Sequence, residues 1–203
     1  MRTAINKKRG YTIIETMISI ALFIIIILAG MNALLNANLL HQKSQNMRSI
    51  MDNLSFVMED MSRNMRTGSN FHCVLQNDPP ITSTSSPVLS QPQSCTSGWA
   101  VAFEFASGVT SNYDDQWVYY VDNTGKIFRA TTGPYVQAAF VQMTPDEVVI
   151  TSAYPFSVLG AGVGSSDNQQ PLIGIKLVGT ITIKNVVTPF SIQTSVSQRV
   201  VDI

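Results

Sequence analysis

The hydrophobic pattern of the chain is dominated by one long apolar stretch near the N-terminus. No ionisable side chain occurs from Thr16 through Leu40, and the centre of the stretch reads ISIALFIIIIL from Ile18 to Leu28. At a rise of 1.5 Å per residue, about 20 such residues cross a hydrocarbon core of about 30 Å. The pattern therefore predicts a membrane-spanning helix.

Beyond this stretch the pattern becomes amphipathic and keeps the spacing of a helix. Apolar residues recur at intervals of three and four, with charged residues on much of the remaining surface; the apolar set is Leu35, Leu39, Met47, Ile50, Met51, Leu54, Val57, Met58, Met61 and Met65. We expect the same helix to continue to Thr67–Gly68, where the glycine would supply a C-cap. A methionine-rich stripe can be a flexible binding face, but burial under a sheet is the favoured interpretation.

Strand patterns occupy the C-terminal half. Residues 69–98 are rich in Pro, Ser and Thr and predict a loop region. From Trp99 onward, short apolar runs alternate with turn residues, and Trp117–Val121, Asp122–Gly125 and Lys126–Arg129 predict a β-hairpin. Further strands are expected in segments 99–105, 148–152, 173–177, 180–184 and 190–201. The predicted fold is α+β, a long N-terminal helix packed on an antiparallel sheet.

Charge narrows the classes of partner. Charged residues make up only 13% of the chain, and the formal net charge is zero. Arg2, Lys7, Lys8 and Arg9 all precede the apolar stretch, so their removal would leave nine basic against 13 acidic side chains. Phosphate backbones require a basic face, so no nucleic acid partner is predicted. The cluster of basic residues before the helix also predicts a cytoplasmic N-terminus and an exported C-terminal domain.

The cysteines, Cys73 and Cys95, lie on the side predicted to be exported. In an oxidising compartment they would form a disulfide that stabilises the fold by roughly 3 kcal/mol. The alternative is two separate buried thiols. A zinc site is disfavoured, because the two histidines, His41 and His72, have no useful ligand spacing to the cysteines.

Glu15 does not fit a simple membrane anchor. A carboxylate in an apolar helix is costly and usually has a partner, yet no cation lies within one helical turn inside the span. If the chain were cut between Gly10 and Tyr11, a new α-amino group would appear four residues before Glu15. A neighbouring copy could then supply the opposite charge. The competing interpretation is an ordinary secretory signal peptide, whose apolar region is shorter and ends at a small-residue cleavage site.

The sequence KKRGYTIIE at residues 7–15 resembles the leader and N-terminus of type IV pilins and type II secretion pseudopilins. The resemblance assigns Gly10 to the residue before the cut, Tyr11 to the N-methylated first residue and Glu15 to the glutamate at the fifth position of the mature chain. The family usually has Phe where this chain has Tyr11. Residues 58–63, the Tyr-rich hairpin and residues 191–199 are loosely similar to J-type minor pseudopilins and related minor pilins.

This resemblance implies a structural subunit of a type IV pilus or secretion pseudopilus, with a minor subunit favoured. The expected parts are a leader peptide (1–10), a transmembrane and filament-core helix (11–38), its amphipathic continuation (39–68), a loop region (69–98) and a β-sheet domain (99–203). The expected partners are other pilin or pseudopilin subunits, prepilin peptidase, an inner-membrane assembly platform and, before assembly, membrane lipid. The expected location is a bacterial inner membrane, single-pass, and then a filament. The alternative is a membrane-anchored extracytoplasmic binding protein that does not assemble.

Other candidate chemistry is weak. The glycines of residues 160–164 lack the Lys-Ser/Thr sequel of a phosphate-binding loop. Asp114, Asp115 and Asp122 could offer oxygens to a calcium ion, but without the spacing of an EF-hand, and solvated turns are favoured. We therefore predict no catalytic residues, no cofactor and no metal.

Overall fold

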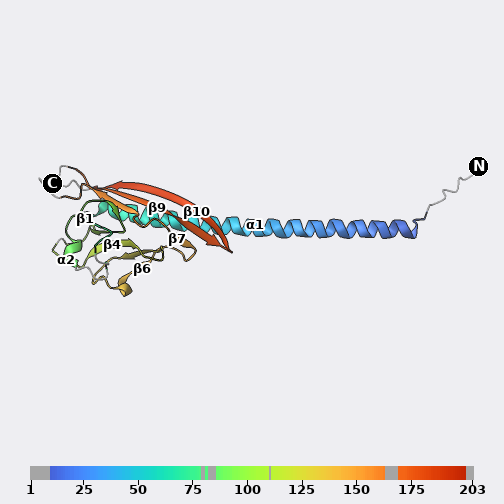
Figure 1. Ribbon diagram of the computed structural model, residues 1–203, viewed down its shortest axis with the longest axis horizontal. Helices are drawn as coiled ribbons and strands as arrows, with labels where there is room; N and C mark the ends of the chain where they lie inside the picture. The colour runs from blue at the N-terminus through green and yellow to red at the C-terminus, as the bar shows by residue number, and fades with distance from the viewer. Residues whose placement is uncertain (1–9, 79–80, 82–85, 110, 163–168, 200–203) are drawn as a thin grey trace, which may run out of the picture. The chain divides into compact units, whose positions relative to one another are not determined.

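The computed structural model describes residues 10–78, 81, 86–109, 111–162 and 169–199. The chain divides into two compact units, Met1–Gln45 and Asn46–Ile203, each of which is described by itself. Helix α1 comes first, and the strands follow it along the chain (Figure 1). The elements are α1 (Ile13–Thr67), β1 (Ser69–Val74), α2 (Ser86–Leu89), β2 (Cys95–Gly98), β3 (Ala100–Glu104), β4 (Gln116–Val121), β5 (Ile127–Ala130), η2 (Gln137–Ala139), β6 (Val141–Gln142), β7 (Val148–Ile150), β8 (Phe156–Leu159), β9 (Leu172–Ile183) and β10 (Val186–Ser197).

Helix α1 ends where the sequence predicts, but for a different reason. Its 55 residues contain no proline, so no break in the backbone ladder is imposed before Thr67. Gly68 follows, and its backbone is not left-handed, so the expected glycine C-cap is wrong. A Cβ at Gly68 would instead collide with the Phe103 ring and lie 3.1 Å from the Glu104 carbonyl oxygen. Glycine is needed here because the chain passes close to β3.

The described residues form two antiparallel sheets, one more than the sequence indicates. The first has the order β1-β3-β4-β5-β6, and the second has the order β10-β9-β8-β2, with β7 also paired to β9. The α+β class and the packing of the long helix on antiparallel strands are confirmed. Segment 69–98, expected to be a loop region, contains β1 and β2 at its two ends.

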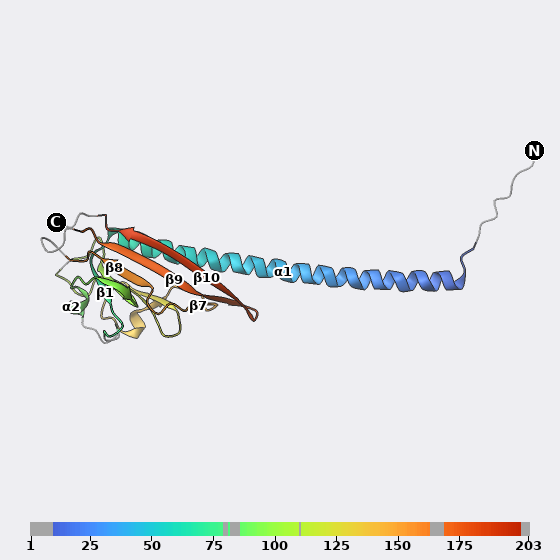
Figure 2. The same cartoon turned by 45° about the horizontal axis from the view of Figure 1, so that its top comes forward.

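Strands β9 and β10 form one long hairpin (Figure 2). Each has 12 residues, and Lys184 and Asn185 form the two-residue turn with φ of 45° and 65°. Positive φ at both turn positions matches the twist of a tight hairpin. The sequence predicts a break in β9 near Gly179, but a Cβ there would collide with the Val149 carbonyl oxygen. Gly179 thus lets β7 approach β9 closely without interrupting the strand.

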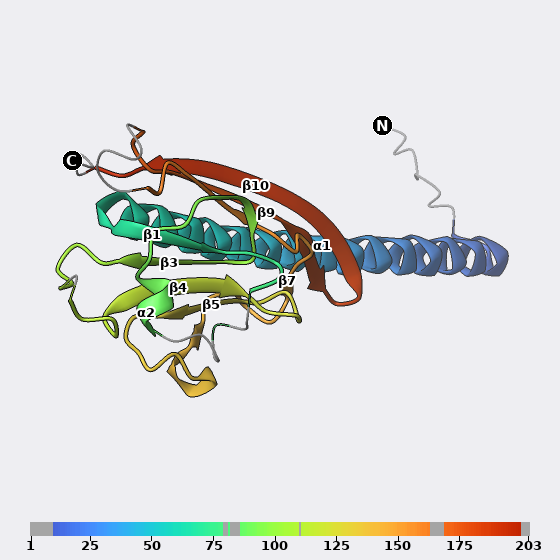
Figure 3. The same cartoon turned by 60° about the vertical axis from the view of Figure 1, so that its left-hand side comes forward.

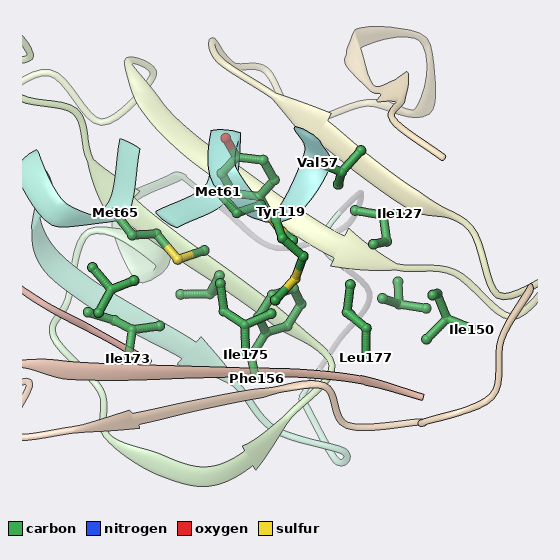
Figure 4. Close-up of a cluster of buried hydrophobic side chains, with 14 of the residues drawn as sticks. Val57, Met61, Met65, Tyr119, Ile127, Ile150, Phe156, Ile173, Ile175 and Leu177 are labelled. Carbon is green, nitrogen blue, oxygen red and sulfur yellow. The ribbon is translucent and has the colours of Figure 1, made fainter. Parts of the chain in front are cut away.

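The last turns of α1 lie between the two sheets (Figure 3). From Ile50 onward one face of the helix is buried, which confirms the predicted core role of the methionine stripe in this part of the chain. Leu35 and Leu39, by contrast, are exposed. Figure 4 shows Met61 and Met65 of the helix with Tyr119 and Ile127 of the first sheet and with second-sheet residues such as Ile175.

A second apolar cluster covers the other face of the first sheet. It joins strand residues Ala100, Ala102 and Val118 to Leu89 of α2 and to Phe140 beyond η2. All five residues of β3 are consequently buried. This explains why the apolar and polar residues of β3 alternate only partly in the sequence, since both faces of the strand are covered.

A polar cluster ties α1 to the first sheet. Asp60 Oδ2 accepts hydrogen bonds from the Tyr119 hydroxyl and from the Arg129 guanidinium, each at 3.0 Å. Asn64, one turn further along α1, donates to the same hydroxyl at 3.1 Å. The Arg129 guanidinium also lies 5.3 Å from the centre of the Trp117 ring. Burial and the Asp60 carboxylate both raise the pKa of Tyr119, although burial dominates.

A disulfide joins Cys73 of β1 to Cys95 of β2, with Cα atoms 5.8 Å apart. Because β1 belongs to the first sheet and β2 to the second, the bond connects the two sheets. Gly98 packs against it, and a Cβ there would lie 3.1 Å from the Cys95 sulfur. The disulfide predicted from the sequence is therefore present.

Two carboxyl groups come together where the β3–β4 loop meets the first sheet. Glu104 is only 4% exposed, and Asp115 accepts the Val109 backbone N–H at 2.8 Å. One buried oxygen of each carboxyl group has no hydrogen-bond partner among the described residues. Burial raises the pKa of Glu104 to about 7, and the charge and hydrogen bonding of Asp115 add to the rise. Protonated and ionised forms of Glu104 are therefore about equally populated near neutral pH.

Removing the disulfide should weaken the domain. We expect the double substitution Cys73→Ala and Cys95→Ala to lower the free energy of unfolding by about 2–4 kcal/mol, mainly because the unfolded chain gains freedom. Urea denaturation of the oxidised protein and the variant measures this difference. Equal midpoints would contradict the structural role of the bond.

The Asp60 cluster should contribute more to the stability of the fold than the exposed ion pair between Glu59 and Arg63. Asp60→Asn leaves Arg129 without its counter-charge, and we expect a loss of about 1–3 kcal/mol in unfolding free energy. The control is Glu59→Gln, which removes a pair with Arg63 whose side chains are 68% and 73% exposed, and we expect a change within about 0.5 kcal/mol. Equal effects in denaturant melts would refute the anchoring role of Asp60.

The raised pKa of Glu104 predicts a specific dependence of stability on pH. A carboxyl group whose pKa rises on folding stabilises the fold fully below its unfolded value of 4.5, and this contribution is lost as the pH passes about 7. Glu104→Gln, which is neutral at every pH, should therefore gain stability relative to the native protein as the pH rises from 4.5 to 7. Thermal unfolding of both proteins across that range measures this effect. If the melting temperatures of the variant and the native protein change in parallel with pH, the prediction is wrong.

Candidate functional site

The strongest candidate site is the N-terminus of α1. Gly10, Tyr11 and Thr12 precede the helix and are exposed. The Thr12 carbonyl oxygen accepts the backbone N–H groups of Glu15 at 3.1 Å and Thr16 at 3.2 Å. The Thr12 hydroxyl also accepts the Glu15 N–H, at 3.4 Å. Thr12 therefore caps the helix, which starts two residues after the predicted cleavage position.

Thr12 and Glu15 occupy the first and last positions of a helix-capping pattern. In the pattern Ser/Thr-x-x-Glu, the first side chain caps an N–H of the third helical residue, and the glutamate lies in the first turn. Our sequence analysis missed this role of Thr12, although the spacing of TIIE at residues 12–15 carries the signal. The first turn also favours negative charge because the helix dipole is positive there. The dipole thus reduces the cost of a carboxylate at Glu15.

The hydroxyl groups that follow are bonded within the helix. Thr16 donates to the Ile13 carbonyl oxygen and Ser19 donates to the Glu15 carbonyl oxygen, both at 2.8 Å. Such bonds satisfy polar side chains without help from water. The start of α1 therefore suits an apolar environment, apart from the Glu15 carboxylate.

The apolar part of α1 is uncovered within the chain. Among the described residues, α1 is the one helix long and apolar enough to cross a membrane, with a mean hydropathy of 2.6 in its most apolar window. None of that window is buried. Every residue from Gly10 to Gln42 is exposed. Apolar surface of this extent requires lipid or another protein to cover it.

The basic leader residues Lys7, Lys8 and Arg9 lie outside the described residues. The structure therefore reports on Gly10, Tyr11 and Glu15 as exposed positions at the start of α1. Their predicted roles in processing and assembly stay predictions.

The aspartates considered for calcium are not brought to one place. Asp114 and Asp115 precede β4 and Asp122 follows it, so the six-residue strand separates them by roughly 20 Å. Asp122 accepts hydrogen bonds from Thr124 and from the Lys126 backbone N–H, and so shapes the β4–β5 turn. Within the described parts of the chain, no group of three His, Cys, Asp or Glu side chains could hold a metal ion.

The histidines lie apart along the chain and have different environments. His72 is buried, and its Nδ1–H donates to the Gln91 carbonyl oxygen at 2.7 Å. His41 is exposed on α1 and contacts Gln45 one turn further along the helix. The glycine loop at residues 160–164 extends into a segment outside the described residues, and Gly160 itself has a φ of 66°.

Comparison with known proteins identifies the N-terminal segment. The family described as the prokaryotic N-terminal methylation motif matches residues 5–31, which include Gly10, Tyr11, Glu15 and the first part of α1. No curated protein and no solved structure matches the chain. The motif indicates a structural protein rather than an enzyme, implies interaction with other pilin subunits and their assembly machinery, and fits anchoring in the inner membrane. The N-terminal methylation motif and the long apolar helix that follows its leader support a protein of the type IV pilin and pseudopilin family.

Proposed function

We propose that this chain is a structural subunit of a type IV pilus or a type II secretion pseudopilus, and a minor subunit of that filament. The observation that carries the proposal is the methylation motif at residues 5–31, which includes the first part of a helix whose apolar window is entirely uncovered. Lipid would cover this surface before assembly, and the same surface on neighbouring subunits would cover it afterwards.

Processing would precede assembly. Prepilin peptidase would hydrolyse the Gly10–Tyr11 peptide bond on the cytoplasmic side of the inner membrane, and the new Tyr11 amine would then be N-methylated. Gly10 offers the enzyme an unhindered backbone, because a Cβ added there would meet no atom within 4 Å. The domain after the span would lie on the extracytoplasmic side, where the disulfide between Cys73 and Cys95 is chemically stable.

The cut would create a positively charged amine near the N-terminus of α1, and the Glu15 carboxylate could offset this charge. A positively charged amine at the start of α1 is unfavourable, because the helix dipole is already positive at that end. The Glu15 carboxylate lies in the first turn of the same helix. In an apolar environment an unpaired charge is costly, so pairing between Glu15 of one subunit and the Tyr11 amine of the next would set their register. The assembly platform in the inner membrane would bring these subunits together.

Substitution of Glu15 tests the register hypothesis. We expect Glu15→Gln to be inserted and cut after Gly10 but to enter filaments at a level reduced by about tenfold or more, since a buried unpaired amine costs over 1.4 kcal/mol. N-terminal sequencing reports the cut, and immunoblotting of sheared filaments reports incorporation. Normal incorporation of the variant would refute the pairing.

Thr12→Val is the matched control, because it removes the capping hydroxyl and keeps the carboxylate. If Glu15 serves only the local helix cap, both variants should assemble equally poorly. If Glu15 pairs with a neighbouring amine, the Thr12 variant should assemble nearly normally. An intact N-terminus at Met1 in the membrane would oppose the whole proposal and favour an anchored binding protein.

A further inference from the structure

Two adjoining hollows form a groove beside the β4–β5 turn, within the unit Asn46–Ile203. The larger has a volume of about 640 Å³ and the smaller about 360 Å³. They share five lining residues, which are Gln76, Trp99, Val121, Asp122 and Asn123. The shared residues place the two hollows side by side, and the volume of each lies within the size range of small-molecule sites.

An indole ring is held at the middle of this groove. The Trp99 Nε1–H donates to the Leu75 carbonyl oxygen at 2.9 Å. The ring also meets Tyr120 edge-on, with centroids 6.0 Å apart and planes at 86°. Trp99 remains partly exposed, and Tyr154, at 37% exposure, lines the smaller hollow. The groove therefore offers apolar aromatic surface whose central ring is already oriented.

Side-chain amides accompany the aromatic surface. Gln76 and Asn123 line both hollows with exposed side chains, and Gln137, whose amide is already hydrogen-bonded to the Tyr120 hydroxyl, lines the larger. Each amide presents both a donor and an acceptor. The turn that carries Asn123 is held by Asp122, whose carboxylate accepts the backbone N–H groups of Thr124 at 3.0 Å and Lys126 at 2.7 Å. The backbone at Asn123 is thus held in place, and its amide extends from an ordered turn.

Charge limits the class of ligand. The described residues that line the groove include no lysine, arginine or histidine, so an anionic ligand would find no counter-charge. The acids that line it, Asp78 and Asp122, already accept hydrogen bonds within the protein, Asp78 from the Leu75 N–H at 2.7 Å. These hydrogen bonds occupy some of the carboxylate oxygens but leave the negative charges in place, so a cation is the competing class of ligand. The aromatic surface and the side-chain amides of the groove fit an uncharged ligand with hydroxyl groups and one apolar face.

We propose that this groove binds a short neutral saccharide. The C–H face of a sugar ring would pack on Trp99, and its hydroxyl groups would bond to the amides of Gln76 and Asn123. This inference does not depend on filament assembly, because the groove is formed by residues after the membrane-spanning segment.

Titration of the full chain with defined sugars tests the proposal. The protein is kept in a polyoxyethylene detergent, because a glycoside detergent would itself compete, and is titrated with maltose, lactose and diacetylchitobiose by saturation-transfer NMR. Glucose 1-phosphate and arginine methyl ester serve as anionic and cationic probes. We expect at least one neutral disaccharide to bind more tightly than both charged probes.

The amide variants locate the binding. Gln76→Ala and Asn123→Ala should each weaken saccharide binding by about five- to tenfold, as expected for one lost hydrogen bond. The control Gln91→Ala removes an exposed amide outside the groove and should bind normally. Melting temperatures of the variants should match that of the native chain. The proposal is overturned if no neutral sugar binds at about 10 mM, if the variants bind as tightly as the native chain, or if a charged probe binds best.

Discussion

The rest of the structure follows from one constraint, which is that the first half of α1 cannot be covered by its own chain. Its apolar window is wholly exposed, and even Leu35 and Leu39 find no cover. Burial of apolar surface is worth about 25 cal/mol per Å², so a helix of this kind remains in lipid or packs with other helices. The internal bonding of Thr16 and Ser19 suits both environments. Glu15 is the exception, because it places a carboxylate in the first turn of this otherwise apolar part of the helix.

The second half of α1 obeys the opposite constraint, because it supplies the centre of a folded core. Met61 and Met65 are fully buried between strands of both sheets. Apolar packing alone would allow a helix to rotate or slide, whereas the hydrogen bonds of Asp60 to Tyr119 and Arg129 specify one orientation. The disulfide between β1 and β2 adds a covalent link between the sheets on either side. Apolar packing and the hydrogen bonds of Asp60 thus hold the helix in the domain, and the disulfide links the two sheets.

Local patterns in the sequence predicted those elements that depend on residues close together in the sequence. The hairpin around Asp122–Gly125 follows from turn chemistry and is present, whereas α1 ends at the predicted residue, Thr67, without the glycine C-cap on which the prediction rested. The capping role of Thr12 was equally readable from its spacing to Glu15 but was missed. Strands β6 and β8 were not predicted, and β6, with two residues, is too short to carry any periodicity. The partners of the N-terminal site could not be predicted in detail, since they belong to other molecules.

The sequence by itself determined the membrane-spanning segment, the methylation motif and the helical stripe of methionines, because these depend on composition and on spacing along one element. Tertiary structure decided everything that depends on two segments meeting. Only the fold shows that Gly68 and Gly179 are required for close approach, that Arg129 reaches Asp60 across 69 positions, and that Trp99 and Asn123 line one groove. The physical reason is that such contacts depend on how strands pair and how faces are covered, which no local pattern specifies.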